Sequence, residues 1–450
     1  MAGIMASSTS FTNILENIGR LIYDDSVVER YMSIVDLYNK IYKIILPPLL
    51  KFLVFFTPLL VFGGTKEIFE FPKMHFVYFI GGTIIWLFAV RKILQGNRIE
   101  QINKWVLLYI AATLVSTVFS THTYTSVWGY YTRFNGGLVS VLVFFGLYIF
   151  LTNELTKERI IELVRIACLS VIPISVYGIW QHILGVERVF STLGQANWLA
   201  AFLTMLIPCI LFFAVTETKK KYMYLWGILY LLAFATLWFT YSLSGMLGLI
   251  TSLIVFALLN KEAIRKHFKI TLILAALSML IAIVQPGIFG TKVKDMITDI
   301  RKIGHIYTHV YASESNASNN QLSDPGYIRT FLWKGTINMI KANPKRIILG
   351  TGPETFAYEF QKYRPQELNY SSEWNFVFNK PHNYYLELLS NTGLFGTIPY
   401  LAILVISLRK RDKFLTPGLV ALYITNMFGW PTVTTTLLFW LFLAGVNKEK

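Results

Sequence analysis

Long apolar segments recur along this chain of 450 residues, and they constrain its fold more than any other feature. They are about 17–25 residues long, the length of an α-helix that crosses a hydrocarbon core of roughly 30 Å. Only 15% of the residues are charged, whereas a soluble domain carries about 25%. We therefore predict an all-α integral membrane protein with about twelve transmembrane helices. The predicted spans are residues 41–62, 74–90, 104–120, 136–152, 160–183, 197–215, 222–241, 244–260, 268–285, 383–407, 415–430 and 433–447.

The basic residues predict how these spans are oriented. We count 25 Lys and Arg residues in one set of termini and connections. The short connections of the opposite face hold four, which are Lys66, Lys73, Arg133 and Arg188. Because connections rich in Lys and Arg remain in the cytoplasm, we predict that both termini are cytoplasmic and that Arg133 and Arg188 lie on the outer face.

This orientation places a large loop, residues 286–382, outside the membrane between the ninth and tenth spans. Residues 292–311 have the pattern of an amphipathic helix, and "SESNASNNQLSDPG" that of a flexible linker. A second helix carries apolar residues from Ile328 to Ile340 mostly on one face and ends at Asn343-Pro344. The stretch "LGTGPETF" is a glycine turn that leads back into a helix. Such a structured loop usually forms a lid or a site.

The N-terminal region is not a cleavable signal peptide, because it lacks an apolar core and contains acidic residues. Its apolar residues repeat at helical spacing, which predicts an amphipathic helix on the membrane surface. These residues are Phe11, Ile14, Leu15, Ile18, Leu21 and Ile22. The predicted division of the chain is a cytoplasmic region at 1–40, helices one to nine at 41–285, the outer loop at 286–382, helices ten to twelve at 383–447, and a cytoplasmic tail at 448–450.

Charge and cysteine content exclude several classes of site. The net charge of +16 does not indicate nucleic-acid binding, because the basic residues cluster between the apolar segments. Cys168 and Cys209 lie within apolar segments and offer neither a disulfide framework nor metal-ligand spacing. His305 and His309 are four residues apart, but no third ligand follows, so a solvated helical face is the simpler interpretation. We predict no metal and no cofactor.

Three outer arginines and one histidine are candidates for chemistry. Arg133, Arg188 and Arg329 suit a lipid-linked phosphate, because guanidinium binds phosphate oxygens in a bidentate manner; alternatively, each extends to lipid headgroups or caps a helix. His382 precedes the predicted tenth span, where the helix N-terminus favours a neutral imidazole that can act as a base. Glu387 lies one turn beyond Asn383 and could orient a partner. The alternative is that the whole His-Asn-Tyr-Tyr cluster only caps the helix at the interface.

Several stretches, in this order, resemble the motifs of the O-antigen ligase and O-antigen polymerase superfamily. They are "RFNGGL", "STLGQANWLAAFLTMLIP", "TYSLSGMLGL", an arginine followed four residues later by a tryptophan (Arg329 and Trp333), "NP", "LGTG", "PHNYYLELLSNTGLFG" and "MFGWPTVTTTLLFWLFLAG". The resemblance extends from about Arg133 to Gly445. It implies a GT-C-like membrane glycosyltransferase that transfers an undecaprenyl-diphosphate-linked glycan as a block to a glycan, lipid or protein acceptor. The resemblance also implies that the enzyme lies in the bacterial cytoplasmic membrane with its active site on the outer face, and that it does not depend on a metal.

The resemblance also assigns roles to residues. His382 occupies the position of the family's essential histidine and, with Arg329, is predicted to be catalytic. The predicted substrate-binding residues are Arg133, Arg188, Asn383, Glu387, Tyr384 and Trp333. One motif departs from the family pattern, because Leu243 stands where many members have an arginine that is thought to hold the diphosphate. Either Arg188 or another cation replaces it, or the donor is held differently.

Two alternatives to a ligase remain open. A polymerase of the same superfamily joins glycan repeat units, and the motifs do not separate it from a ligase. A transporter or flippase for a lipid-linked glycan belongs to a different class, which often shows internal repeats and charges deep in the membrane. We find no repeat here, and the cations gather at one face. A scaffold within a polysaccharide assembly complex would leave the positions of the arginines and the histidine unexplained.

Overall fold

The computed structural model describes residues 25–99, 102–288, 325–371 and 373–448. The regular secondary structure of these residues consists of helices, with no β-strand. The predicted surface helix before residue 25, the predicted helix at 292–311 and almost all of the predicted linker lie outside the described residues. The membrane-domain helices before the outer loop are α2 (Asp25–Phe56), η1 (Thr57–Leu59), α3 (Glu70–Phe76), η2 (Val77–Gly81), α4 (Gly82–Gln95), α5 (Lys104–Val118), α6 (Thr123–Trp128), α7 (Leu138–Glu154), α8 (Lys157–Ile183), η3 (Ser191–Leu193), α9 (Ala196–Thr216), α10 (Lys220–Phe239), α11 (Leu243–Leu259), α12 (Lys261–Lys266) and α13 (Phe268–Val284). The outer loop and the following segment contain α15 (Pro325–Lys341), α16 (Pro344–Leu349), α17 (Phe356–Glu359), η4 (Phe360–Tyr363), η5 (Gln366–Tyr370), α18 (Tyr384–Arg409), α19 (Thr416–Thr425) and α20 (Val433–Asn447).

Each of the twelve predicted spans coincides with a helix. Among the described residues, six helices are long and apolar enough to cross a membrane, and six further apolar helices have 10–17 residues. The chain is therefore an all-helical, multi-pass membrane protein. Six spans satisfy the length requirement, and twelve crossings remain a prediction.

Two helices differ in extent from the predicted spans. Helix α2 begins at Asp25 and continues through the predicted boundary at residue 40. Its first half pairs with α4, because the hydroxyls of Tyr31 and Tyr38 donate hydrogen bonds of 2.6 Å to carbonyl oxygens of α4. Helix α19 ends at Thr425, so residues 426–432 form a loop between α19 and α20, and this loop contributes to the candidate site.

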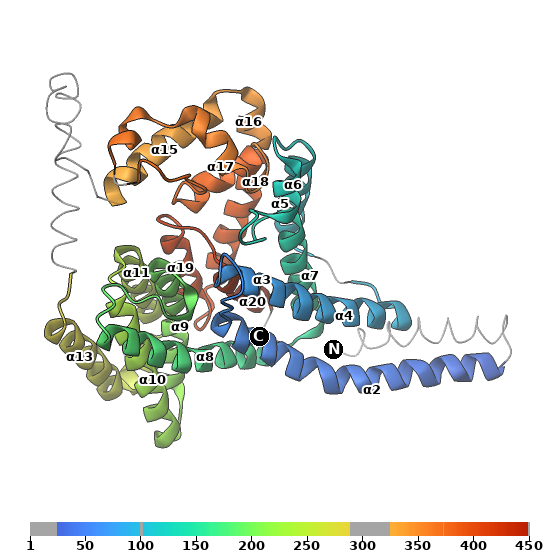
Figure 1. Ribbon diagram of the computed structural model, residues 1–450. Helices are drawn as coiled ribbons and strands as arrows, with labels where there is room; N and C mark the ends of the chain where they lie inside the picture. The colour runs from blue at the N-terminus through green and yellow to red at the C-terminus, as the bar shows by residue number, and fades with distance from the viewer. Residues whose placement is uncertain (1–24, 100–101, 289–324, 372, 449–450) are drawn as a thin grey trace, which may run out of the picture.

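The core of the membrane domain is built around α9 and α20. Both helices are apolar and buried along almost their whole length, as expected of helices that are hydrophobic on every face. Helix α9 packs against α10, α11 and α19, whereas α20 packs against α7 and α8. In Figure 1, α2 and α4 extend side by side away from this core.

The basic connections that were predicted to share the cytoplasmic face are joined by ion pairs. Lys157, at the start of α8, contacts Asp412 at 2.6 Å, in the connection between α18 and α19. The Lys157 Nζ also donates a 2.5 Å hydrogen bond to the carbonyl oxygen of Gly445, near the end of α20. Arg91 and Lys92 both pair with Glu154 at the end of α7. These pairs hold the basic ends of several helices together.

The outer loop folds around a small apolar core of its own. Figure 1 shows α15, α16 and α17 gathered at one end of the molecule beside the start of α18. The core residues are Ile328, Leu332, Met339, Phe356, Phe360, Leu368 and Phe378. As predicted, the second loop helix ends before Asn343, whose side chain caps the next helix, α16, by accepting a hydrogen bond of 2.9 Å from the amide of Lys345.

The loop is joined to α18 by two interlocked glycines. Gly393 interrupts α18 with φ of 60°, and a Cβ there would lie 2.2 Å from the carbonyl oxygen of Ile348. Gly350, in the "LGTG" turn, has φ of 73°, and a Cβ there would lie 2.2 Å from the carbonyl oxygen of Asn391. Both positions require glycine because they combine a left-handed backbone with direct contact between main chains. The two glycine motifs are therefore the two halves of one contact.

Candidate active site

His382 lies in a strained turn immediately before α18. Its φ is 56°, in the left-handed region that residues other than glycine seldom occupy. The turn is fixed on both sides. The Trp333 Nε1 donates a 3.0 Å hydrogen bond to the carbonyl of Pro381, and the amide of Tyr384 donates one of 2.9 Å to the carbonyl of Asn426. The Asn383 side chain caps α18 by accepting hydrogen bonds from two backbone amides.

The imidazole of His382 is partly buried beside Trp430, from the loop between α19 and α20. The two rings meet edge to face with centroids 5.0 Å apart. Burial, together with the positive charges of Arg329 and Arg133, lowers the pKa of His382 to about 4. The imidazole is therefore neutral at pH 7. After burial, the two arginines are the electrostatic causes of this shift.

Arg133 is held by aromatic rings. Its guanidinium carbon lies 5.3 Å from the centroid of Trp198 and 5.7 Å from that of Trp430, within the range of cation–π attraction. Its Nε is buried and has no hydrogen-bond partner in the described part of the chain. Trp430 thus contacts both His382 and Arg133, and it lies at the centre of the candidate site.

Arg188 reaches the same region through Asn197. The Arg188 Nε donates a 3.2 Å hydrogen bond to the carbonyl of Thr240, and an NH2 group donates one of 3.0 Å to the Asn197 Oδ1. The Ser242 hydroxyl donates to the same Oδ1 at 2.9 Å. Burial lowers the pKa of Arg188, but an arginine remains charged at neutral pH. This cation therefore lies beside the segment in which Leu243 departs from the family pattern.

A small cavity lies between His382 and Asn197, the residue that accepts a hydrogen bond from Arg188. Its volume is about 20 Å³, and its lining includes His382, Asn197, Ser244 and Trp430. Arg329, on α15, also acts on this region, since its charge influences His382 and the Glu373 carboxyl. Arg133 and Arg329 thus act on His382 through their charge, whereas Arg188 reaches this cavity only through the side chain of Asn197.

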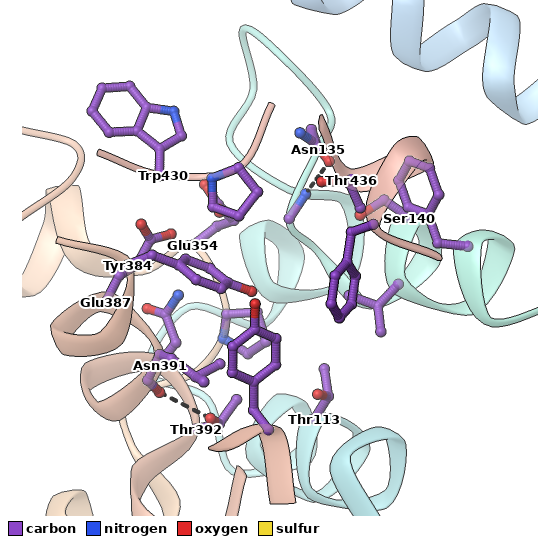
Figure 2. Close-up of a pocket in the computed structure, with 18 of the residues that line it drawn as sticks. Thr113, Asn135, Ser140, Glu354, Tyr384, Glu387, Asn391, Thr392, Trp430 and Thr436 are labelled. Atoms are coloured by element: carbon purple, nitrogen blue, oxygen red, sulfur yellow. Dashed lines mark hydrogen bonds between the residues drawn. The ribbon is translucent and has the colours of Figure 1, made fainter. Parts of the chain in front are cut away.

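A second cavity, of about 100 Å³, is also lined by Trp430 (Figure 2). In its wall, the Lys380 ammonium group donates hydrogen bonds to the carboxylates of Glu354 and Glu387. The side chains of all three residues are at most 8% exposed. Burial acts to lower the pKa of Lys380, but the two carboxylates outweigh it and raise the pKa above its usual value, so the ammonium remains charged.

The structure assigns distinct places to the predicted site residues. His382 and Arg133 both contact Trp430, Arg329 acts on His382 through its charge, and Arg188 is bonded to Asn197. Asn383 and Trp333 shape the turn that holds the histidine, and Tyr384 and Glu387 line the second cavity. The site also contains five residues that were not predicted, which are Trp198, Asn197, Glu354, Lys380 and Trp430. Lys380 and Trp430 could have been found from the sequence, because the "NKPH" and "GWP" stretches lie within or beside motifs already noted.

No group of three or more His, Cys, Asp or Glu side chains within the described ranges is arranged to hold a metal ion. The histidine pair at 305 and 309 lies outside those ranges. Cys168 and Cys209 are both buried as free thiols.

Comparison with known protein families supports the resemblance noted in the sequence. Residues 228–401 match the family model described as O-antigen ligase. The matched range contains Arg329, Trp333 and His382, whereas Arg133 and Arg188 precede it. No curated protein sequence matches the chain.

Proposed function

Because residues 228–401 match the family model described as O-antigen ligase, we propose that this chain is a membrane glycosyltransferase of the O-antigen ligase and polymerase superfamily. It transfers a polyprenyl-diphosphate-linked glycan as a block to an acceptor hydroxyl or amide on the outer face of the bacterial cytoplasmic membrane. The observation that carries this proposal is that two cations, Arg133 and Arg329, act on the neutral His382, while Arg188 is bonded to Asn197 in the lining of the cavity beside that histidine.

In the proposed reaction, the bond between the sugar anomeric carbon and the diphosphate oxygen breaks, and a bond from the acceptor atom to that carbon forms. The acceptor loses a proton, which His382 accepts. The polyprenyl diphosphate leaves as an anion, and the guanidinium groups of Arg133 and Arg329 stabilise its developing charge. In this scheme the arginines stabilise the negative charge that a divalent ion stabilises in many other transferases.

The low pKa of His382 fits this role once the donor is considered. In the free protein, the positive charges of Arg329 and Arg133 disfavour the imidazolium. A bound diphosphate places negative charge beside these arginines and offsets their effect, so the pKa of His382 rises towards its ordinary value. The histidine becomes a stronger base only when the leaving group is in place.

Arg188 is proposed to substitute for the arginine that the family usually carries at the position of Leu243. Its guanidinium is tied to Ser242, in the same motif, through the side chain of Asn197. Ligase activity is the leading proposal, and polymerisation of repeat units uses the same donor chemistry. Twelve crossings with both termini in the cytoplasm would place this site outside.

The test is transfer by the full chain reconstituted in liposomes, with a polyprenyl-diphosphate oligosaccharide and candidate acceptors. His382→Ala and Arg329→Ala are each expected to reduce release of polyprenyl diphosphate by about a hundredfold or more. The matched controls are His75→Ala, an exposed histidine on α3, and Lys334→Ala, an exposed cation on α15; both should keep the wild-type rate.

Two outcomes would overturn the proposal. Unchanged rates in both site variants would show that the site is elsewhere. Movement of labelled lipid-linked glycan across the bilayer without any transfer would identify a transporter. Loss of turnover on chelation, restored by a divalent ion, would contradict only the metal-independent mechanism.

A further inference from the structure

The second cavity, which Glu354, Lys380 and Glu387 help to line, has more unpartnered polar atoms than a site with only a structural role should have. It is lined by residues of α3, α5, α7, α18 and α20. Four buried atoms of its lining have no hydrogen-bond partner among the described residues. They are the Glu70 Oε1, the Glu387 Oε2, the Asn391 Oδ1 and the Arg133 Nε. Glu70 is 2% exposed and Glu387 3%.

Such atoms indicate a ligand. Leaving a buried polar atom without a partner costs about 1–3 kcal/mol, and native proteins contain only a few such atoms per 100 residues, so four of them around one cavity are a local concentration. In Figure 2, Glu387 and Asn391 lie on one side of the cavity and Thr113 and Ser140 on the other. Four unpartnered atoms around one cavity are therefore a polar site that a second molecule completes.

The atoms define the chemistry of that molecule. Three of the four are hydrogen-bond acceptors, so the ligand must supply several donors. The lining has three carboxylates, those of Glu70, Glu354 and Glu387, and two cations, Arg133 and Lys380, so it does not favour an anion. Lys73 does not line the cavity, but it lies one helical turn from Glu70 and offsets the remaining negative charge, which favours an uncharged ligand. Aromatic rings complete the wall, with Tyr384, Tyr400 and Trp430 among them.

We propose that this cavity is a subsite for one uncharged sugar residue, whose hydroxyls donate hydrogen bonds to Glu387, Glu70 and Asn391. A pyranose combines hydroxyl donors with apolar C–H faces that can lie against aromatic rings. The volume of about 100 Å³ admits part of one such residue and not an oligosaccharide. This inference rests on the proposed function, and it identifies what the site recognises beyond the diphosphate.

The position of the cavity suits this role. Trp430 lines both this cavity and the small one at His382, and Arg133 lies against Trp430 and also lines the larger cavity. A sugar bound here would therefore be next to both the proposed base and a proposed phosphate ligand. The sugar belongs either to the donor or to the acceptor, since both present the same hydroxyls.

Asn391→Leu separates binding from stability. The amide oxygen of Asn391 has no partner in the described protein, and the backbone carbonyl that accepts from Ser116 and Gly352 is kept. We expect the thermal stability of this variant to be unchanged or higher, with sugar affinity reduced about tenfold. Asn391→Ala is the second variant, because it also removes the amide but fills less of the space that the asparagine occupies. Thr416→Val is the control, because the Thr416 hydroxyl is also buried without a partner in the described residues but lines no part of this cavity.

Calorimetry on the detergent-solubilised full chain would use glucose, galactose and mannose, each as a polyprenyl-diphosphate donor and as a methyl glycoside. If Asn391→Leu weakens binding of a donor and Thr416→Val does not, the subsite holds the donor sugar. If the same is found for a methyl glycoside, the subsite holds the acceptor sugar.

A deoxy sugar that lacks the recognised hydroxyl should bind the wild-type protein about tenfold more weakly, and it should bind Asn391→Leu no more weakly than the parent sugar does. If no probe binds wild type, or if Asn391→Leu and Asn391→Ala both bind like wild type, the cavity holds water only and the inference is overturned. The dependence of transfer on His382 would be unaffected by that result.

Discussion

The indole Nε1 of Trp333 donates a 3.0 Å hydrogen bond to the carbonyl oxygen of Pro381. This contact joins α15, in the outer loop, to the strained turn that holds His382. Arg329 lies one turn earlier on the same helix, so α15 positions both the arginine and the histidine. The four-residue spacing of Arg329 and Trp333, noted in the sequence, therefore has a physical reason.

Trp333→Phe tests this positioning role. The substitution keeps an aromatic ring in the loop core but removes the hydrogen bond. We expect the free energy of unfolding to fall by about 1 kcal/mol and kcat for transfer to fall about ten- to a hundredfold, because the turn loses its anchor. KM for the donor should change little. The control is Trp374→Phe, on an exposed ring of the same loop; a similar loss there would argue against a specific role for Trp333.

Arg133→Lys tests the aromatic support of the donor site. Lysine keeps the charge but lacks the planar guanidinium that Trp198 and Trp430 contact and that binds phosphate in a bidentate manner. We expect KM for the donor to rise about tenfold. Lys345→Gln is the control, since Lys345 is an exposed cation 4.7 Å from the ring of Phe119 and outside the site. Donor binding that survives Arg133→Lys unchanged would remove Arg133 from the proposed phosphate ligands.

Leu243→Arg tests whether Arg188 replaces the usual family arginine. Arg188→Gln alone is expected to raise KM for the donor about tenfold through loss of a charge-assisted contact. Leu243 begins α11, next to Ser242, and Ser242 shares Asn197 with Arg188. Adding Leu243→Arg to Arg188→Gln should restore most of the donor affinity. Failure of this double variant, with normal thermal stability, would mean that the donor is held differently here.

The membrane architecture was predictable because lipid imposes simple rules. The length of each apolar segment predicted a helix, and all twelve predicted spans coincide with helices. The start of α2 was missed because residues 25–40 alternate apolar and charged side chains. Hydropathy does not register a helix that is stabilised by pairing with another, as Tyr31 and Tyr38 show.

The candidate site was only partly predictable, since its contacts join distant segments. The motifs pointed to His382 and Arg329. They did not indicate that Trp430, in the loop after α19, contacts both His382 and Arg133. Nor did they place Lys380 between two carboxylates, because Glu354 reaches that position only when the Gly350 turn packs on α18. Glu387, which was predicted to orient a partner, is 3% exposed and pairs with Lys380.

Gly393→Ala tests the contact between the outer loop and α18. The backbone at Gly393 is left-handed, and a methyl group would lie 2.2 Å from the carbonyl of Ile348. We expect the free energy of unfolding to fall by about 2–4 kcal/mol, measured by thermal denaturation in detergent. Gly82→Ala is the control, because Gly82 is helical and a methyl group there would have nothing within 4 Å, so alanine should stabilise by up to about 1 kcal/mol. Equal melting temperatures for Gly393→Ala and wild type would mean that the loop is not locked to α18 in this way.

The pH dependence of transfer tests the state of His382. The pKa of His382 in the folded protein, about 4, lies below the ordinary value of 6.5. The imidazole therefore stays neutral as the pH falls from 8 to about 5, and kcat/KM for the donor, which reports the free enzyme, should hold over this range and decline near pH 4. The acid limb of kcat reports the donor-bound enzyme and should lie at least about one pH unit higher, because bound diphosphate offsets the arginines. Arg329→Gln removes one of the charges that lower the pKa, so the acid limb of kcat/KM should move to higher pH, whereas His75→Gln should leave the profile unchanged.

The contribution of His382 to the free energy of unfolding changes in the same direction. This contribution is fully present above pH 6.5 and is lost as the pH falls towards 4, because the unfolded chain binds the proton first. An acid limb of kcat/KM at pH 6.5 or above, or one that does not respond to Arg329→Gln, would contradict the lowered pKa of His382 and the effect of Arg329 on it.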